Sequence, residues 1–242
     1  MILTDERWQE LLHVRATNPG AVRQAYATRK RRQQLLSDRG TLFLVAAEGL
    51  LDRRTLLERL LVALANPAVD GVLGTPDVVE ELLLLDALHD KVVIGSMNRD
   101  EEFTGYDART LIDCGLDGGK LLLRPAGTAP ALQAGADAVT ELAAYGLVAV
   151  IELPEDPASL ARAVTIASGL GTTSAHTWLQ LPPTSPAAVL GATTLPVVLG
   201  GLPPDRTLEH AVVRGLVMGP AQLGGNVEAA VETAAKVLEA AK

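Results

Sequence analysis

The chain has 242 residues, of which 48% are hydrophobic and only 3% aromatic, and its formal net charge is −8. This length is long for one small domain and short for two. A core filled by Leu, Val and Ala favours a parallel sheet buried on both faces over an aromatic-rich antiparallel sandwich. The acidic balance argues against nucleic acid as the main partner.

The single cysteine, Cys114, excludes an internal disulfide and a Cys-based zinc site, and it is typical of a reducing compartment. Residues 1–7 lack the positively charged start and apolar run of a signal peptide. No apolar stretch approaches the roughly 20 residues that span a membrane. We therefore expect a cytoplasmic protein that has no membrane partner.

Residues 1–40 are polar and charged, with Trp8, Leu11, Leu12 and Val14 at helical spacing. This pattern predicts an N-terminal helical extension. The basic run at residues 29–32 lacks the aromatic and glycine context of a nucleic-acid-binding arm. We therefore interpret it as a solvated helix face.

Residues 41–242 alternate between short apolar runs and helical patterns. The runs predicted as strands are residues 42–47, 69–74, 91–96, 116–124, 147–153, 173–181, 196–200 and 213–218. The predicted helices are residues 54–66, 78–88, 108–114, 131–145, 157–169 and 227–241. Such alternation specifies a parallel sheet, and this many units in about 200 residues favour a closed barrel. The sequence therefore predicts a single (β/α)8 TIM barrel of the α/β class over 41–242.

Lys120 is a candidate catalytic residue, because the C-terminal ends of the strands carry the chemistry of such barrels. Side chains alternate along a strand, so Lys120 points into the barrel if Leu121 and Leu123 pack on helices. Burial favours the uncharged amine, which is the nucleophilic form. The alternative is a structural lysine paired with a barrel carboxylate such as Glu152 or Glu48.

Two carboxylates follow apolar runs at predicted strand ends. Glu152 comes after the run at residues 148–151, which makes it a candidate general acid or base. Its alternative role is an ion pair that only neutralises Lys120. Glu48 has the same character after the first strand, and its alternative is a position that points to solvent.

Further polar, aromatic and glycine residues at strand ends are candidates for substrate binding, and the neighbouring Arg99 can bind an anionic ligand. The candidates are Ser96, Asn98, Arg124, Gln180, Trp178, Gly200 and Gly201. The glycines can let a phosphate approach backbone amides. The alternatives are loop capping for Ser96 and Asn98, a surface ion pair for Arg99, core packing for Trp178, and a plain tight turn for the glycines.

Four stretches resemble a known family: residues 70–77, 91–99, 103–107 and 115–124. They resemble the class I aldolase superfamily, in particular a bacterial group of aldolase-like barrels related to deoxyribose-phosphate, class I fructose-bisphosphate and tagatose-bisphosphate aldolases. The resemblance is strongest over residues 42–125. It implies a barrel in which a lysine forms an imine with a carbonyl substrate and carboxylates move protons, without a metal or other cofactor.

The same resemblance implies that the site has changed. The imine lysine that the relatives carry on strand six corresponds to Gln180, within Thr-Trp-Leu-Gln-Leu-Pro at residues 177–182. Their Asp-His pair after strand one corresponds to Glu48-Gly49, and their phosphate-binding arginine after strand eight to Pro220. The positions that match residues lining the relatives' pocket are Lys120, Arg124 and Glu152.

Three functions are compatible with these residues. In the first, Lys120 forms the imine, as a strand-four lysine does in the transaldolase group. In the second, Glu48, Glu152 and Lys120 perform acid–base chemistry such as an isomerisation or rearrangement, and Gln180 donates a hydrogen bond to a substrate oxygen. In the third, a non-catalytic relative binds a ligand or a partner subunit. We interpret the chain as an aldolase-like lyase of carbohydrate metabolism with altered chemistry on a small oxygenated carbonyl substrate, and we expect a homo-oligomer or a paired barrel subunit.

Overall fold

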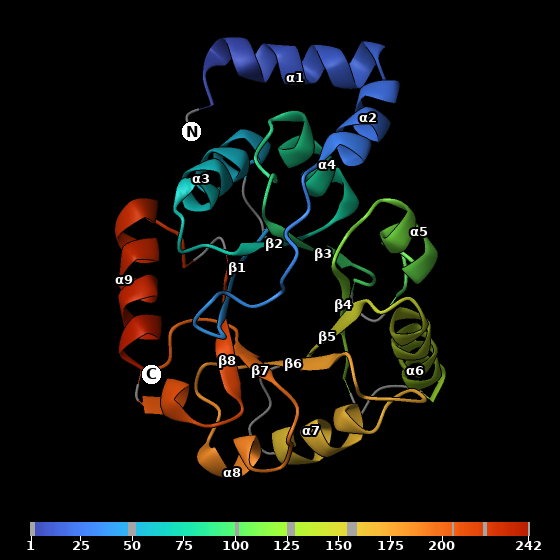
Figure 1. The fold of residues 1–242 in the computed structure, drawn as a ribbon, viewed down its shortest axis with the longest axis vertical. Helices are drawn as coiled ribbons and strands as arrows, with labels where there is room; N and C mark the ends of the chain where they lie inside the picture. The colour runs from blue at the N-terminus through green and yellow to red at the C-terminus, as the bar shows by residue number, and fades with distance from the viewer. Residues whose placement is uncertain are drawn as a thin grey trace.

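The computed structural model describes residues 3–47, 52–99, 102–124, 129–153, 159–204, 206–219 and 222–241. Parallel strands close into one barrel in chain order, β1 to β8, and β8 pairs back onto β1 (Figure 1). The predicted (β/α)8 barrel is therefore confirmed. The strands are β1 (Leu42–Ala46), β2 (Gly71–Gly74), β3 (Val92–Ser96), β4 (Gly118–Leu122), β5 (Val148–Glu152), β6 (Thr177–Leu181), β7 (Val197–Leu199) and β8 (Val213–Met218).

Helices surround the barrel in Figure 1. They are α3 (Arg53–Ala65), α4 (Pro76–Leu84), α5 (Ala108–Asp113), α6 (Ala129–Ala144), α7 (Leu160–Ser168), α8 (Ala187–Leu190), the 3-10 helix η1 (Arg206–Glu209) and α9 (Val227–Ala240). Both α8 and η1 were absent from the sequence-based prediction, because four residues are too few to show helical periodicity. Among the described residues, no helix is long and apolar enough to cross a membrane.

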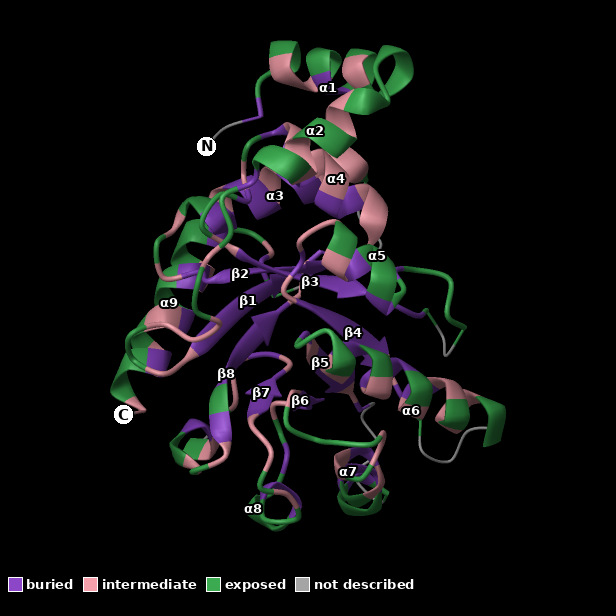
Figure 2. Cartoon of the chain, turned by 45° about the vertical axis from the view of Figure 1, so that its right-hand side comes forward, coloured by how far each residue is buried: buried purple, intermediate pink, exposed green. Residues whose placement is uncertain are grey.

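The N-terminal extension contains two helices, α1 (Asp5–Thr17) and α2 (Gly20–Thr28), as the helical pattern predicted. Helix α2 packs against α4, and α1 lies on the far side of these helices from the barrel (Figures 1 and 2). These two helices are therefore attached to one side of the barrel, whereas Leu35 and Leu36 later in the extension pack against the cluster that fills the barrel.

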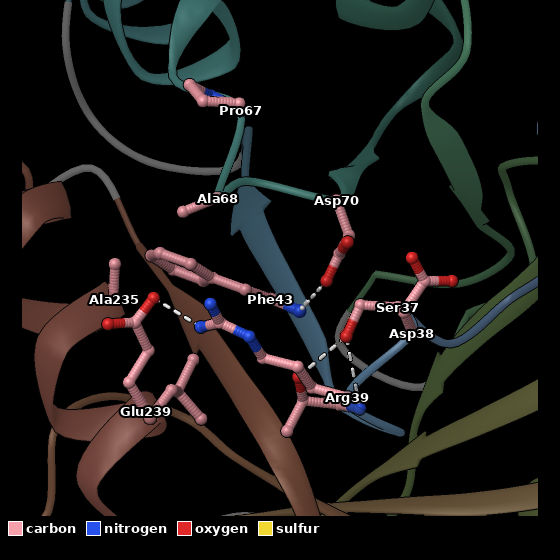
Figure 3. A pocket seen from close by; sticks show the side chains of 11 residues that line it. Ser37, Asp38, Arg39, Phe43, Pro67, Ala68, Asp70, Ala235 and Glu239 are labelled. Carbon is pink, nitrogen blue, oxygen red and sulfur yellow. Dashed lines mark hydrogen bonds and ion pairs between the residues drawn. The ribbon is translucent and has the colours of Figure 1, made fainter.

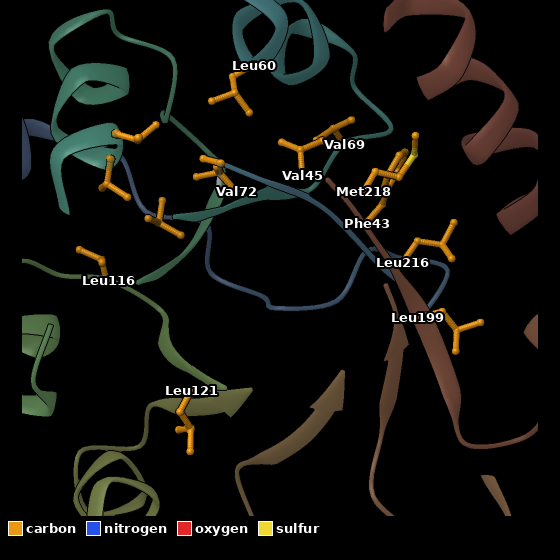
Figure 4. Packing of buried hydrophobic residues seen from close by; sticks show 14 of the residues in the cluster. Phe43, Val45, Leu60, Val69, Val72, Leu116, Leu121, Leu199, Leu216 and Met218 are labelled. Carbon is orange, nitrogen blue, oxygen red and sulfur yellow. The ribbon is translucent and has the colours of Figure 1, made fainter. Parts of the chain in front are cut away.

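Alternation along the strands divides the core into two layers. The inner layer fills the barrel and consists of Leu42, Leu44, Leu73, Val92, Ile94, Val150, Trp178, Val198 and Val217. The outer layer lies between strands and helices, where Phe43 and Val45 of β1 belong to the same cluster as Leu60 of α3 (Figure 4). The strands are almost entirely buried while the helices expose their outer faces (Figure 2). Lys120 and Glu152 have the same strand parity as the inner layer, which directs them inward.

Residues 29–41 leave α2 and pass across the N-terminal end of the barrel (Figure 1). Arg29 is only 8% exposed, and its guanidinium donates to the carbonyl oxygens of Lys91 at 2.9 Å and Gly115 at 2.5 Å. The interpretation of residues 29–32 as a solvated helix face is therefore wrong for Arg29. The helix ends at Thr28, and the buried guanidinium satisfies carbonyls that precede β3 and β4.

Two aspartates continue this attachment at the strand beginnings. Asp70 accepts a hydrogen bond from the Phe43 N–H at 2.7 Å and pairs with Arg32 at 2.5 Å. Asp117 accepts one from the Val93 N–H at 2.8 Å. Each carboxylate thus satisfies a backbone donor of the preceding strand. The N-terminal end of the barrel is consequently tied together by charged groups that are already paired.

Candidate functional site

Lys120 and Glu152 meet at the C-terminal end of the barrel, here called the barrel mouth. Their strands are neighbours, with Lys120 opposite Val150 and Glu152 opposite Leu122 in the register of β4 and β5. The Lys120 Nζ lies 2.7 Å from Glu152 Oε2. Lys120 is 5% exposed, whereas the Glu152 side chain is 30% exposed. An ammonium and a carboxylate at this distance share a charge-assisted hydrogen bond along which a proton can pass.

Gln180 stands beside this pair on the next strand, because the register of β5 and β6 places it opposite Glu152. The side chain is 8% exposed, and within the described part of the chain its Oε1 has no hydrogen-bond partner. A buried amide oxygen without a partner is unfavourable unless a ligand or a water molecule donates a hydrogen bond to it. Gln180 is thus available to a bound molecule at the barrel mouth.

Ser96 and Asn98 lie on the opposite side of Lys120, at and just beyond the end of β3. Ser96 is 3% exposed and stands opposite Lys120 in the register of β3 and β4. The Asn98 amide donates to the Leu122 carbonyl at 2.8 Å and accepts from the Leu122 N–H at 2.7 Å. The Asn98 side chain therefore pairs with the backbone of β4 as a neighbouring strand would. This role resembles the loop capping that was the alternative to ligand binding.

A polar cavity of about 320 Å³ opens over the ends of β2 and β3, next to Ser96. Its lining residues are Thr75, Pro76, Asp77, Ser96, Asn98, Arg99, Thr104 and Gly105. Thr104 lies in the 103–107 stretch that resembles the family, but it was not a predicted site residue, since no local pattern brings this loop residue back over the strand ends. The cavity extends the candidate site away from Glu152 and toward β2.

The turns after β7 and β8 are filled by Gln222. The Gly219 N–H donates to Gln222 Oε1 at 2.8 Å, and Gln222 Nε2 donates to the Gly200 carbonyl at 3.2 Å. The N–H groups of Gly200 and Gly201 donate to the carbonyls of Leu181 at 2.8 Å and Leu199 at 2.9 Å. The N–H groups of Gly200 and Gly201 therefore already have hydrogen-bond acceptors. The contacts of Gln222 with the two turns could not be predicted from the sequence.

The remaining candidates are more widely spread. Trp178 belongs to the apolar inner layer of the barrel, below the polar residues of the mouth. Arg124 is exposed two residues beyond the end of β4. Glu48 lies outside the described residues. The proposed roles of these three stay predictions.

A second cavity, of about 370 Å³, lies at the opposite end of the barrel (Figure 3). Asp70 in its wall bonds the Phe43 N–H, and Arg39 pairs with Glu239 across the opening. Because active sites of these barrels lie at the C-terminal ends of the strands, we assign the candidate site to the mouth. Among the described residues, no group of three or more His, Cys, Asp and Glu side chains is arranged to hold a metal ion.

Comparison with solved structures supports the class of fold. An archaeal fructose 1,6-bisphosphate aldolase matches with a TM-score of 0.65 and 14% identity, covering 85% of this chain and 96% of that chain. A Schiff base forming fructose-1,6-bisphosphate aldolase matches with a TM-score of 0.63 and 14% identity, over 84% and 96% of the two chains. At this identity the likeness shows the fold alone, which is a (β/α)8 barrel.

The family is shown by closer matches. The model of the Cgl0159-like family matches residues 38–235. The crystal structure of Cgl0159 from Corynebacterium glutamicum matches with 36% identity and a TM-score of 0.89, covering 99% of each chain. This chain belongs to the Cgl0159-like family. Comparison with curated protein sequences gives no match.

Proposed function

We propose that this chain is an enzyme that cleaves or forms a carbon–carbon bond in a small oxygenated carbonyl compound, with Lys120 as the imine-forming residue. The observation that carries the proposal is the 2.7 Å contact between Lys120 Nζ and Glu152 Oε2, made by a lysine that is 5% exposed. A nucleophile and a base within hydrogen-bond reach are the usual arrangement for covalent catalysis.

The first steps follow from this geometry. Glu152 takes a proton from the Lys120 ammonium, and the neutral amine attacks the carbonyl carbon of the substrate. Glu152 gives this proton to the new alkoxide and takes a second one from the added nitrogen, which forms the neutral carbinolamine. It then gives the second proton to the carbinolamine hydroxyl, which leaves as water and gives a protonated imine. The proton moves between two groups already in contact, so no large side-chain motion is needed.

Bond cleavage uses the same two residues. The Glu152 carboxylate removes the proton of a hydroxyl on the carbon beyond the bond that breaks. The electron pair of that bond moves into the protonated imine, giving an enamine on Lys120 and releasing an aldehyde. Protonation of the enamine carbon and hydrolysis of the imine release the second product and restore the amine.

Gln180 supports substrate binding in this proposal. Its buried Oε1 lacks a partner among the described residues and faces the same mouth as Glu152. A substrate hydroxyl can donate to this oxygen, which would relieve the unfavourable state of an unpaired buried amide. If the amide is rotated so that its nitrogen occupies this position, it donates to a substrate oxygen instead.

A second candidate is acid–base chemistry without an imine. It is favoured by the ion pair itself, since a lysine held as an ammonium by Glu152 can polarise a substrate oxygen while the carboxylate moves a proton. The catalytic groups would be unchanged, but no covalent adduct would form. A homo-oligomer or a paired barrel subunit remains a further proposal about assembly.

Borohydride trapping with glyceraldehyde, dihydroxyacetone and pyruvate, followed by intact mass and peptide mapping, tests the proposal. We expect an adduct on Lys120 and none in Lys120→Arg, which keeps a cation beside Glu152. Lys91 is an internal control, because burial lowers its pKa although it lies at the other end of the barrel, donating to the Val69 carbonyl at 2.6 Å. Ligand binding without an adduct on Lys120 would favour the second candidate.

A further inference from the structure

The cavity over β2 and β3 lies within reach of a molecule held at Lys120. Ser96 lines the cavity and stands opposite Lys120 in the register of β3 and β4. Neighbouring strands are about 4.8 Å apart. A carbonyl compound of a few carbons at Lys120 can therefore extend its remote end past Ser96 into the cavity.

Arg99 is the available cation in this cavity. It is exposed, and within the described residues its guanidinium makes no hydrogen bond or ion pair. The other charged group in the lining, Asp77, is already paired with Arg53 and accepts a hydrogen bond from the Thr75 hydroxyl at 2.5 Å. Among the described lining residues, Arg99 is thus the one cation without a partner, beside neutral hydroxyl and amide groups and the paired Asp77.

The opposite side of the mouth is less suited to an anion. Gln222 occupies the turn after β8 and accepts the Gly219 N–H, and the N–H groups of Gly200 and Gly201 bond to carbonyls. An incoming phosphate would have to displace these contacts. On the β2–β3 side, the N–H groups of the Arg99 guanidinium can bind an anion without displacing such contacts.

We infer that the substrate carries a carboxylate at the end remote from its carbonyl, and that Arg99 binds this carboxylate in the cavity over β2 and β3. A guanidinium forms two parallel hydrogen bonds to one carboxylate. The single positive charge of Arg99 also balances the single negative charge of a carboxylate. A phosphate dianion would bring more negative charge than Arg99 balances, close to the Asp77 carboxylate. The inference deepens the proposed function and rests on it only for the position of the carbonyl at Lys120.

Binding of probes that have no carbonyl separates this inference from imine chemistry. Isothermal titration compares 5-hydroxypentanoate with the neutral pentane-1,5-diol, which has the same carbon chain. We expect the wild type to favour the carboxylate by about tenfold or more, the ratio that one charge-assisted pair supplies. Arg99→Gln should reduce this ratio to about one, and Arg99→Lys should restore only part of it, because an ammonium lacks the fork.

The matched control is Arg23→Gln, which removes an exposed arginine of α2 that does not line the cavity. It should keep the wild-type preference. The inference is overturned if Arg99→Gln keeps the preference, if the wild type shows none, or if inorganic phosphate binds at Arg99 more tightly than the carboxylate does. Absence of a borohydride adduct on Lys120 would instead overturn the proposed function and leave the Arg99 result standing.

Discussion

The Lys120 Nζ lies 2.7 Å from Glu152 Oε2, and the two side chains reach this contact from adjacent strands inside a barrel mouth. The lysine is almost fully buried and the carboxylate is partly open to solvent. Such a pair gives little net stability, because the desolvation of the charges offsets much of their attraction. The contact is therefore better placed for chemistry than for holding the barrel together.

Variants of Lys120 and Glu152 should show whether the pair contributes mainly to the free energy of unfolding or to activity. We expect Lys120→Met to lower the free energy of unfolding by about 1–3 kcal/mol, less than for a fully buried pair because Glu152 is partly solvated. The double variant Lys120→Met with Glu152→Leu should recover most of this loss while remaining inactive. Urea titration of the single and double variants checks this. A double variant that is less stable than either single variant would show that the pair is structural.

Arg29 should be far more important for stability than its neighbour Arg31. Both pair with Asp117, but Arg29 is 8% exposed and donates to two partly buried carbonyls. Arg31 donates to one carbonyl, that of Leu116 at 3.3 Å, and its side chain is 46% exposed. We expect Arg29→Met to cost about 2–4 kcal/mol, since it leaves two partly buried carbonyls without a donor and removes one of the two cations beside Asp117. Arg31→Met should cost less than about 1 kcal/mol. Equal losses in thermal or urea unfolding would contradict this account of the extension.

Gly118 should not tolerate a side chain. A Cβ at this position would overlap the Val148 carbonyl oxygen of the next strand, which cannot move without disturbing the barrel. We expect Gly118→Ala to lower the free energy of unfolding by about 3 kcal/mol. Gly20→Ala at the start of α2 is the control, where the nearest atom would be 3.4 Å away and a change within about 1 kcal/mol is expected. Similar stability of the two variants would contradict the packing described here.

Asp107 should contribute a pH-dependent part of the stability. Its carboxylate caps α5 by accepting the Thr110 N–H at 2.6 Å, and this hydrogen bonding with Thr110 lowers the pKa of Asp107. A carboxyl whose pKa is lower in the folded state stabilises the fold above its unfolded pKa of about 3.9. This stabilisation is lost as the pH falls through the folded pKa.

The isosteric variant Asp107→Asn keeps the capping oxygen but cannot titrate. We expect the wild type to lose more stability than Asp107→Asn between about pH 5 and pH 3, with similar stability of the two at pH 7. Urea midpoints at several pH values provide the measurement. Parallel pH profiles for the two proteins would exclude this contribution.

The barrel could be predicted from the sequence because each strand is a compact apolar run and most helices show a periodic apolar face. The same alternation along a strand predicted that Lys120 points inward, and the position of Glu152 after an apolar run predicted that it lies at a strand end. The four-residue α8 and η1 could not be predicted, since so short a segment has no measurable period.

Long-range polar partners were also beyond local sequence patterns. Asn98 bonds the backbone of Leu122, and Arg29 bonds carbonyls more than 60 residues away in the chain. Gln222 fills a turn whose glycines by themselves suggest an open backbone site. These contacts depend on which loops the closed barrel brings together, and the periodicity of one segment contains no information about them.

The rate of borohydride-trapped adduct formation on Lys120, compared between the wild type and Glu152→Gln, tests the central claim most directly. Glutamine keeps the size of Glu152 and a hydrogen bond to the amine, but it cannot take a proton. We predict an adduct mapped to Lys120 in the wild type and about a hundredfold slower formation in Glu152→Gln, the lower end of what a positioned acid–base group contributes. An equal rate in the two proteins, or an adduct only on lysines outside the barrel mouth, would contradict the account.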